Sequence, residues 1–314
     1  MKIGVVGPGA MGGLLAVKLA RAGLEVRVLD HRPERAALIG RQGIELLTGE
    51  EEVREMVPVT LDPAALGDVE LILICVKAYD TEGVARQLQA LPSGPYFLTL
   101  QNGVGNVELL GKYLPPEKIL AGITSHGATS LGPGRIRHAG VGDTYIGLGF
   151  GESSEEAHPG LRLARTCLAA AGFATRIVPR ICSLIWSKLM VNVGINALTA
   201  LTGLRNGGLL DFPATERIMA AAVREAVQVA EARGIPLLFD NPLEEVRKVC
   251  RQTGPNISSM LQDVLRQKKT EIDYINGAIV REGEKLGRLV PVNSLLTGLV
   301  QTIENSYEQR VRTF

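Results

Sequence analysis

The sequence predicts an α/β domain with a doubly wound, mostly parallel sheet, followed by an all-α helical domain. Three observations lead to this prediction. Short β-branched runs alternate with helical patterns over the first half of the chain, and a glycine-rich turn directly follows the first run. Strand-like runs then stop after Pro179, and only helical patterns follow. Alternating strands and helices imply βαβ units, whereas a helix-only region implies a separate packing layer.

The first half of the chain contains seven runs that we expect to be strands. The stretch Leu71–Val76 is apolar without alternation, as in a central strand that is covered on both faces. Glycine-rich breaks at 132–134 and 140–142 predict a hairpin-like excursion near the end of the sheet. The predicted strands are Lys2–Val6, Glu25–Leu29, Glu70–Val76, Tyr96–Leu100, Ile119–Thr124, Thr144–Gly149 and Thr175–Val178, with helices at Gly9–Ala22, Pro33–Gly40, Thr81–Ala90 and Glu156–Ala171.

The second half consists of helical patterns separated by Gly, Pro or Asn. We place the domain boundary near Pro179, which gives an α/β domain at 1–179 and an all-α domain at 180–314. The predicted helices are Arg180–Leu204, Pro213–Arg233, Pro242–Gln252, Ser258–Leu286 and Ser294–Arg312.

Composition excludes several classes of protein. The chain has 314 residues, 46% hydrophobic and 21% charged, and a net charge of +1, which disfavours disorder and gives no sign of a nucleic-acid partner. Four cysteines without a CxxC pair fit reduced thiols in the cytoplasm, and the scattered histidines offer no metal site. The uncharged stretch Leu189–Leu204 is shorter than the roughly 20 apolar residues of a membrane span, so no membrane segment is expected.

A GxGxxG motif follows the first predicted strand and begins the first predicted helix. In this position the first glycine makes a tight turn, the second lets the backbone approach a pyrophosphate, and the third lets helix and strand pack closely. The motif predicts a Rossmann-type dinucleotide site, because a glycine-rich turn without a ligand is less common in this context. Its residues are Gly7, Pro8, Gly9, Ala10, Met11 and Gly12.

Two residues at the end of the second strand bear on the choice of cofactor. Asp30 is placed to accept hydrogen bonds from the adenosine ribose, which disfavours a 2′-phosphate. Arg32 could instead clamp that phosphate. Alternatively, both are solvated turn residues. We expect NADPH, with NADH as the alternative, on the view that the aspartate turns toward solvent and loses much of its repulsion.

Polar residues interrupt the helical half in three places. Lys188, Asn192 and Asn196 follow i, i+4, i+8 spacing, so they share one face of a helix in an apolar segment. We expect polar residues in such a stripe to line a cleft, to bind a ligand or to form a polar interface between the domains. The segment Asn256–Asp263 predicts either a carboxylate site at a helix start or an ordinary N-cap. Glu271, taken alone, is more simply a surface charge.

Eight segments together form a distinctive set: the glycine motif, Val76–Ala78, Gln101–Gly103, His126–Ala128, Trp186–Asn192, Asn196–Ala200, Asn256–Asp263 and Thr270–Gly277. Through these segments the chain resembles, over almost its full length, the 2-dehydropantoate 2-reductase (ketopantoate reductase) family. That family pairs a Rossmann domain with a helical domain and reduces 2-dehydropantoate to pantoate, a step toward coenzyme A. The resemblance therefore implies a dinucleotide-binding Rossmann domain at 1–179 and a helical substrate and catalytic domain at 180–314.

The resemblance implies a role for each matching position. Lys188 matches the proton donor to the ketone oxygen, and Glu271 matches a carboxylate between substrate and nicotinamide ribose. The family commonly has an arginine that holds the NADPH 2′-phosphate without an aspartate just before it, so Asp30 is a departure. The positions that match the family's substrate contacts are Asn102, Asn192, Asn196, Asn206, Asn256 and Ser259. The positions that match its cofactor contacts are the glycine motif, Lys77, Asn102, Ala128 and Glu271.

The chemistry of these residues is consistent with carbonyl reduction. A lysine ammonium can stabilise the developing alkoxide and then protonate it, without a metal. Two alternatives remain: a related reductase of another branched or aromatic 2-keto acid, and a non-catalytic dinucleotide sensor, against which the joint presence of Lys188 and Glu271 argues. A homodimer through apolar positions of the last helices is possible, with core packing as the simpler expectation.

Overall fold

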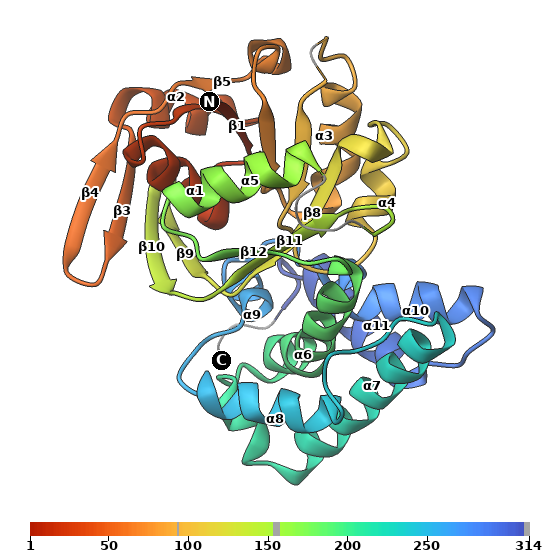
Figure 1. Ribbon diagram of the computed structural model, residues 1–314. Helices are drawn as coiled ribbons and strands as arrows, with labels where there is room; N and C mark the ends of the chain where they lie inside the picture. The colour runs from red at the N-terminus through yellow and green to blue at the C-terminus, as the bar shows by residue number, and fades with distance from the viewer. Residues whose placement is uncertain (93, 153–157, 311–314) are drawn as a thin grey trace. The chain divides into compact units, whose positions relative to one another are not determined.

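The computed structural model describes residues 1–92, 94–152 and 158–310, and these divide into two compact units (Figure 1). Unit 1 comprises Met1–Gln101 and Asn106–Ile181. Unit 2 comprises Asn102–Gly105 and the chain from Cys182 onward. Unit 1 is built around a parallel sheet with helices and unit 2 is helical, so the predicted fold class is confirmed.

The main sheet of unit 1 has eight strands in the order β12-β11-β8-β7-β6-β1-β2-β5. Pairing from β5 to β8 is parallel throughout, whereas β11 runs antiparallel to β8. Chain order reverses at β1, which makes the carboxyl ends of β1 and β6 a topological switch point, where open α/β sheets bind ligands. The strands are β1 (Lys2–Val6), β2 (Glu25–Leu29), β5 (Val59–Thr60), β6 (Leu71–Ile74), β7 (Tyr96–Thr99), β8 (Ile119–Thr124), β11 (Thr144–Leu148) and β12 (Thr175–Ile177).

Alternate residues of the central strands enter two separate cores. Ile3 and Val5 of β1 pack with α1, α2 and α5, whereas Val6 packs on the other face with α3 and α4. Burial on both faces explains why these strands read as continuous apolar runs. The helices of unit 1 are α1 (Ala10–Arg21), α2 (Pro33–Gln42), α3 (Thr81–Leu88), α4 (Asn106–Leu110) and α5 (Pro159–Ala170).

The predicted hairpin forms, but it does not lie at the end of the main sheet. Strands β9 (Gly127–Gly132) and β10 (Arg135–Gly140) belong to a second sheet, of order β4-β3-β10-β9, with β3 (Ile44–Thr48) and β4 (Glu51–Glu55). Ile136 and Ile44 close this sheet over α1, where Gly13 leaves room for them. The parallel pairing of β10 with β3, about 90 residues apart in the chain, has no local sequence signal.

Unit 2 contains six helices among its described residues: α6 (Ile181–Thr202, which starts at the unit boundary), α7 (Pro213–Ala232), α8 (Pro242–Gln252), α9 (Ser259–Leu265), α10 (Asn276–Lys285) and α11 (Pro291–Asn305). The single helix predicted over Ser258–Leu286 is wrong. It is broken after Leu265, where Gln267 adopts a φ of 54°, and a 3₁₀ turn at Ile272–Tyr274 precedes α10. By length and composition alone α6 could cross a membrane, but 67% of its most apolar window is buried in the protein.

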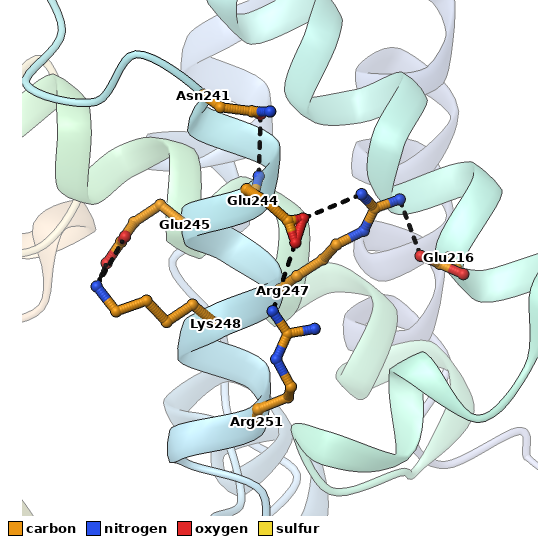
Figure 2. A network of polar contacts seen from close by, with 7 residues as sticks. All are labelled: Glu216, Asn241, Glu244, Glu245, Arg247, Lys248 and Arg251. Atoms are coloured by element: carbon orange, nitrogen blue, oxygen red, sulfur yellow. Dashed lines mark hydrogen bonds and ion pairs between the residues drawn. The ribbon is translucent and has the colours of Figure 1, made fainter.

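Ion pairs join α7 and α8 on the outside of unit 2 (Figure 2). Arg247 lies between Glu216 of α7, at 2.9 Å, and Glu244 of its own helix, at 3.3 Å. Asn241 caps α8 by accepting a hydrogen bond from the backbone N–H of Glu244. Each of these partly exposed ion pairs contributes little to the stability of the fold. The apolar face of α8, including Val246 and Cys250, packs into the core of unit 2 and anchors the helix.

A buried amide network fixes α10 inside unit 2. The Asn276 amide donates to the Asn293 side chain at 3.0 Å and to the Val193 carbonyl of α6 at 3.3 Å. Asn293 in turn donates to Glu225 of α7 at 2.8 Å. Buried polar groups that are hydrogen-bonded in this way hold their elements in one arrangement, so the segment just before α10 is anchored at its carboxyl end.

Candidate active site and dinucleotide-binding turn

The three motif glycines meet different surroundings. A Cβ on Gly7, whose φ is +90°, would lie 2.7 Å from Val76, and a Cβ on Gly12 would lie 2.1 Å from the Gly7 carbonyl oxygen. These two glycines are required by the packing of strand and helix. A Cβ on Gly9 would meet nothing within 4 Å. Gly9 therefore leaves an open approach to the start of α1, which is what a pyrophosphate needs.

Further polar residues follow the carboxyl ends of the neighbouring strands. Lys77 comes just after β6 and precedes the short turn Ala78–Asp80. The side-chain amide of Gln101, just after β7, donates to the Val76 carbonyl at 2.9 Å and to the Thr81 hydroxyl at 2.8 Å. Gln101 thus ties the ends of β6 and β7 together. The sequence alone does not indicate this role for Gln101, although the residue precedes Asn102 in the segment Gln101–Gly103.

The surroundings of Asp30 correct one sequence-based expectation. Its side chain does not turn toward solvent: it is 0% exposed and forms a bidentate ion pair with Arg35, with distances of 2.5 and 2.6 Å. Hydrogen bonds and charge from Arg35 hold the pKa of this carboxyl below its usual value, although burial acts in the opposite direction. Arg32 is exposed at the start of α2, and its backbone N–H also donates to Asp30.

Ala128 lies in β9 and pairs with His138 of β10. The His138 ring stacks on that of His126, which lies between β8 and β9. The segment His126–Ala128 therefore has a packing role in joining the two sheets of unit 1. Nothing in the sequence indicated that its histidine has a second histidine as partner.

In unit 2 the polar stripe lies on α6 in an otherwise apolar environment. Lys188 and Asn192 are partly buried, and Asn196 is buried. Burial lowers the pKa of Lys188 to about 8, and the negative charge of Glu271 opposes that shift. An ammonium of this kind is charged at neutral pH and loses its proton more easily than an exposed lysine does.

Glu271 is 7% exposed, so it is not the surface charge that its sequence context alone suggests. Its segment is held on both sides. The backbone N–H of Thr270 donates to Glu304 of α11 at 2.6 Å, and that of Tyr274 donates to the Glu271 carbonyl at 3.0 Å. The negative charge of Glu271 raises the pKa of Lys188, although the two residues come from distant parts of the chain.

The loop Asn102–Gly105 clusters with this segment of unit 2. The Val104 N–H donates to the Tyr274 carbonyl at 3.0 Å. A Cβ on Gly103, whose φ is +84°, would lie 2.3 Å from the same oxygen. The backbone beside Asn102 therefore contacts the turn that follows Glu271, which places two of the expected site residues in one neighbourhood.

The remaining expected substrate residues gather near the start of α9. The Thr199 hydroxyl of α6 lies 2.6 Å from that of Ser258, and Ser258, rather than Ser259, caps α9 by accepting from the Leu261 N–H. The backbone N–H of Asn206 donates to the Asn256 carbonyl at 3.1 Å. The side-chain oxygen of Asn206 is buried without a hydrogen-bond partner among the described residues. Asn256 and Ser259 are exposed.

A glycine turn at a sheet switch point, with a partly buried lysine and a buried carboxylate in a helical unit, defines a two-domain oxidoreductase of the Rossmann type. Comparison with known proteins agrees with this class. The protein-family model described as ketopantoate reductase PanE/ApbA matches residues 3–149, and the model for the C-terminal part of that family matches residues 180–304. The chain belongs to the ketopantoate reductase family.

Named relatives extend over nearly the whole chain. A 2-dehydropantoate 2-reductase of Halobacterium salinarum is 36% identical over 307 residues, which is 96% of this chain and 98% of the relative. A ketopantoate reductase structure from Ralstonia eutropha JMP134 has a TM-score of 0.88 at 33% identity, covering 98% of this chain and 100% of that one. D-mandelate dehydrogenase with NADH and anilino(oxo)acetate has a TM-score of 0.89 at 29% identity, with the same coverage.

Proposed function

We propose that this chain reduces 2-dehydropantoate to pantoate, with NADPH as the hydride donor. Unit 1 would bind the dinucleotide through the glycine turn, and unit 2 would bind the keto acid and supply the catalytic residues. The name of the Halobacterium salinarum relative supports this substrate. The single observation that carries the proposal is the partly buried Lys188, whose pKa of about 8 suits a proton donor at neutral pH.

When bound at the glycine turn, the reduced dinucleotide would supply the hydride that the C2 carbonyl carbon of the keto acid accepts. Lys188 donates a hydrogen bond to the carbonyl oxygen and then a proton from Nζ, which stabilises the negative charge that develops there. Glu271 favours the charged form of the lysine and would hold the nicotinamide ribose. A preorganised pair of this kind needs little rearrangement during the reaction.

Asparagine side chains would bind the substrate without adding charge. Asn192 and Asn196 lie one and two turns after Lys188 on the same helix, so they would contact atoms beside the carbonyl. Amides can donate to a carboxylate and accept from a hydroxyl, whereas an acidic residue would repel the anion. The other proposed substrate contacts are Asn102, Asn206, Asn256 and Ser259.

The choice of NADPH over NADH is a separate part of the proposal. Arg32 is exposed beside the end of β2, where it could bind a 2′-phosphate through a charge-assisted contact. The structure that contains NADH belongs to a relative at 29% identity, so NADH is the alternative. The ratio of kcat/KM for the two cofactors in the wild type tests this part, and Arg32→Ala should abolish a preference for NADPH. A preference for NADH that is lost in Asp30→Ala would contradict it.

The activity itself is tested by following the loss of NADPH absorbance with 2-dehydropantoate and a panel of branched and aromatic 2-keto acids. The panel includes phenylglyoxylate, because a D-mandelate dehydrogenase has the same fold. We expect the highest kcat/KM with 2-dehydropantoate. A higher value with an aromatic keto acid would assign the related reductase activity instead, and no turnover with any of them would favour a sensor.

A further inference from the structure

The carboxylate of Asp30 has most of its hydrogen-bonding capacity occupied inside unit 1. Oδ2 accepts from Nε of Arg35 at 2.5 Å, and Oδ1 accepts from Nη2 of Arg35 at 2.6 Å and from the Arg32 backbone N–H at 3.1 Å. An ionised carboxylate offers about four lone-pair sites, so three of them are taken. The side chain is also fully buried. An aspartate in this state is poorly placed to accept both hydroxyls of a ribose.

Arg35 also changes the charge at the end of β2. A bidentate arginine–carboxylate pair is close to neutral when seen from outside, and here both partners are largely removed from solvent, with Arg35 only 18% exposed. The pKa of Asp30 stays below its usual value, so the pair consists of two ions and not of a neutral acid. The exposed guanidinium of Arg32, which contacts His31, is a positive charge left at this strand end, and Glu34 is a negative one in the first turn of α2.

Local sequence explains why the pair forms. Pro33 starts α2 directly after the strand end, with Arg32 as its N-cap residue, and Arg35 therefore lies in the first turn of this helix. Asp30 is fixed from the other side by its backbone N–H, which donates to the Thr60 carbonyl of β5 at 3.0 Å. The two side chains thus meet between one strand end and one helix start, five positions apart in the chain.

We propose that Arg35 is a specificity-determining residue, which allows the site to accept a 2′-phosphate by neutralising Asp30 and holding its carboxylate away from the ribose. This inference rests on the proposed dinucleotide site at the carboxyl end of β2. Arg35 acts through Asp30 and need not touch the cofactor. It is therefore a positioning residue, and Arg32 remains the group that would contact the phosphate.

The test compares the binding of NADP⁺ and NAD⁺ by calorimetry, together with kcat/KM for NADPH and NADH, in the wild type and in Arg35→Gln. The substitution frees the negative charge of Asp30. We expect the ratio of NADP⁺ affinity to NAD⁺ affinity to fall at least about tenfold, or about 1.4 kcal/mol. Arg35→Lys keeps the charge but not the bidentate geometry, and it should give a smaller fall.

The double variant Asp30→Asn/Arg35→Gln is the matched control, because it removes both charges of the pair. Its affinity ratio should return to within about threefold of the wild-type ratio, in the manner of a double-mutant cycle. An equal loss for both cofactors in Arg35→Gln would show a merely structural ion pair and overturn the inference. A ratio that stays low in the double variant would also overturn it, since the effect would not pass through Asp30.

The outcome separates this inference from the proposed cofactor preference. A wild type that prefers NADH would contradict the proposed NADPH preference alone, because the inference concerns the change of the ratio on replacing Arg35 and not its starting value. Should Arg35→Gln fold poorly, as judged by thermal melting, the single variant Asp30→Asn provides the second measurement. It leaves the positive charge of Arg35 without its carboxylate, so the ratio of NADP⁺ affinity to NAD⁺ affinity should rise, and an unchanged or lower ratio would overturn the inference.

Discussion

The Nδ1 atom of His126 lies 3.0 Å from Nε2 of His138, and the two buried imidazole rings stack with their centroids 5.2 Å apart. Burial lowers the pKa of both rings, and Lys18 lowers them further. The charge of His138 also lowers the pKa of His126, whereas Asp143 and the backbone at Gly142 act weakly in the opposite direction. Both rings are therefore held in the neutral form at neutral pH.

This pair should make the stability of unit 1 depend on pH. An unfolded histidine titrates near pH 6.5, so below that value the unfolded chain takes up protons before the folded chain does. The contribution of the two neutral histidines to the free energy of unfolding is complete above about pH 6.5. It is lost as the pH falls toward the lowered pKa values of the folded protein. We expect the melting temperature to fall between about pH 7 and 5.5, and less steeply in His138→Gln. An exposed histidine, His31→Gln, is the control, and an identical slope in His138→Gln would contradict the assignment.

Replacing Lys188 by alanine should lower kcat by about 10²–10⁴-fold while cofactor affinity stays near the wild-type value. The reason is that the lysine acts mainly in the transition state. Steady-state kinetics at saturating 2-dehydropantoate and calorimetry with NADP⁺ measure the two effects. Lys248→Ala, which removes an exposed lysine paired with Glu245, is the matched control. Near-normal turnover in Lys188→Ala would exclude the lysine as proton donor.

The pH profile of reduction should follow the protonation of Lys188. Because the pKa of this lysine is about 8, kcat/KM should be constant near neutrality and fall about tenfold per pH unit well above 8. Glu271→Gln removes the charge that raises this pKa, so the fall should begin at lower pH. If kcat/KM begins to fall at the same pH in Glu271→Gln as in the wild type, another group controls the pH profile.

Glu271→Ala should damage both KM and kcat, because the residue is proposed to position substrate and cofactor as well as to favour the charged lysine. A misplacement of about 1 Å can cost roughly 10²-fold in rate. Kinetics with both substrates varied measures the two parameters. Glu284→Ala, a change on α10, serves as the control. Wild-type kinetics in Glu271→Ala would leave the buried carboxylate with a structural role only.

The motif glycines provide a matched pair of substitutions. Gly9→Ala adds a methyl group into open space, so the protein should keep its melting temperature but bind NADP⁺ and NAD⁺ several-fold more weakly. Gly12→Ala would force a Cβ to 2.1 Å from the Gly7 carbonyl and should lower the melting temperature itself. Unchanged cofactor affinity in Gly9→Ala would show that the pyrophosphate does not approach this backbone.

The fold could be predicted well where one local pattern determines an element. Strands β1 and β2 have the predicted bounds. Ile3–Val6 of β1 is buried on both faces, whereas β2 alternates, with Val26 and Val28 buried and Glu25 exposed. Strand β4 has the sequence Glu51–Glu55, with four charged residues among five, and no local pattern distinguishes it from a turn. The end of α9 was missed for a related reason, since neither Gly nor Pro marks the left-handed residue Gln267.

For the candidate site, the sequence identified residue types but not their surroundings. The spacing of Lys188, Asn192 and Asn196 placed them on one helix face, as α6 has them. The segment around Glu271 is held by contacts of Thr270 with α11 and of Tyr274 with the loop at Val104, which no local pattern encodes. The Asp30–Arg35 pair is local, but the sequence does not predict it, because three arginines lie within five positions of the aspartate and sequence alone does not select one.

The contact of Val104 with Tyr274 has a consequence for dividing the gene. A helical half expressed from residue 182 onward would lack Asn102–Gly105, the short segment that joins it from the first half of the chain. The Tyr274 carbonyl would then lose its hydrogen-bond donor, and the apolar core of that half would lose the side chain of Val104. Gene fusion or split-protein designs should therefore supply this tetrapeptide again, for example as an N-terminal extension or by circular permutation.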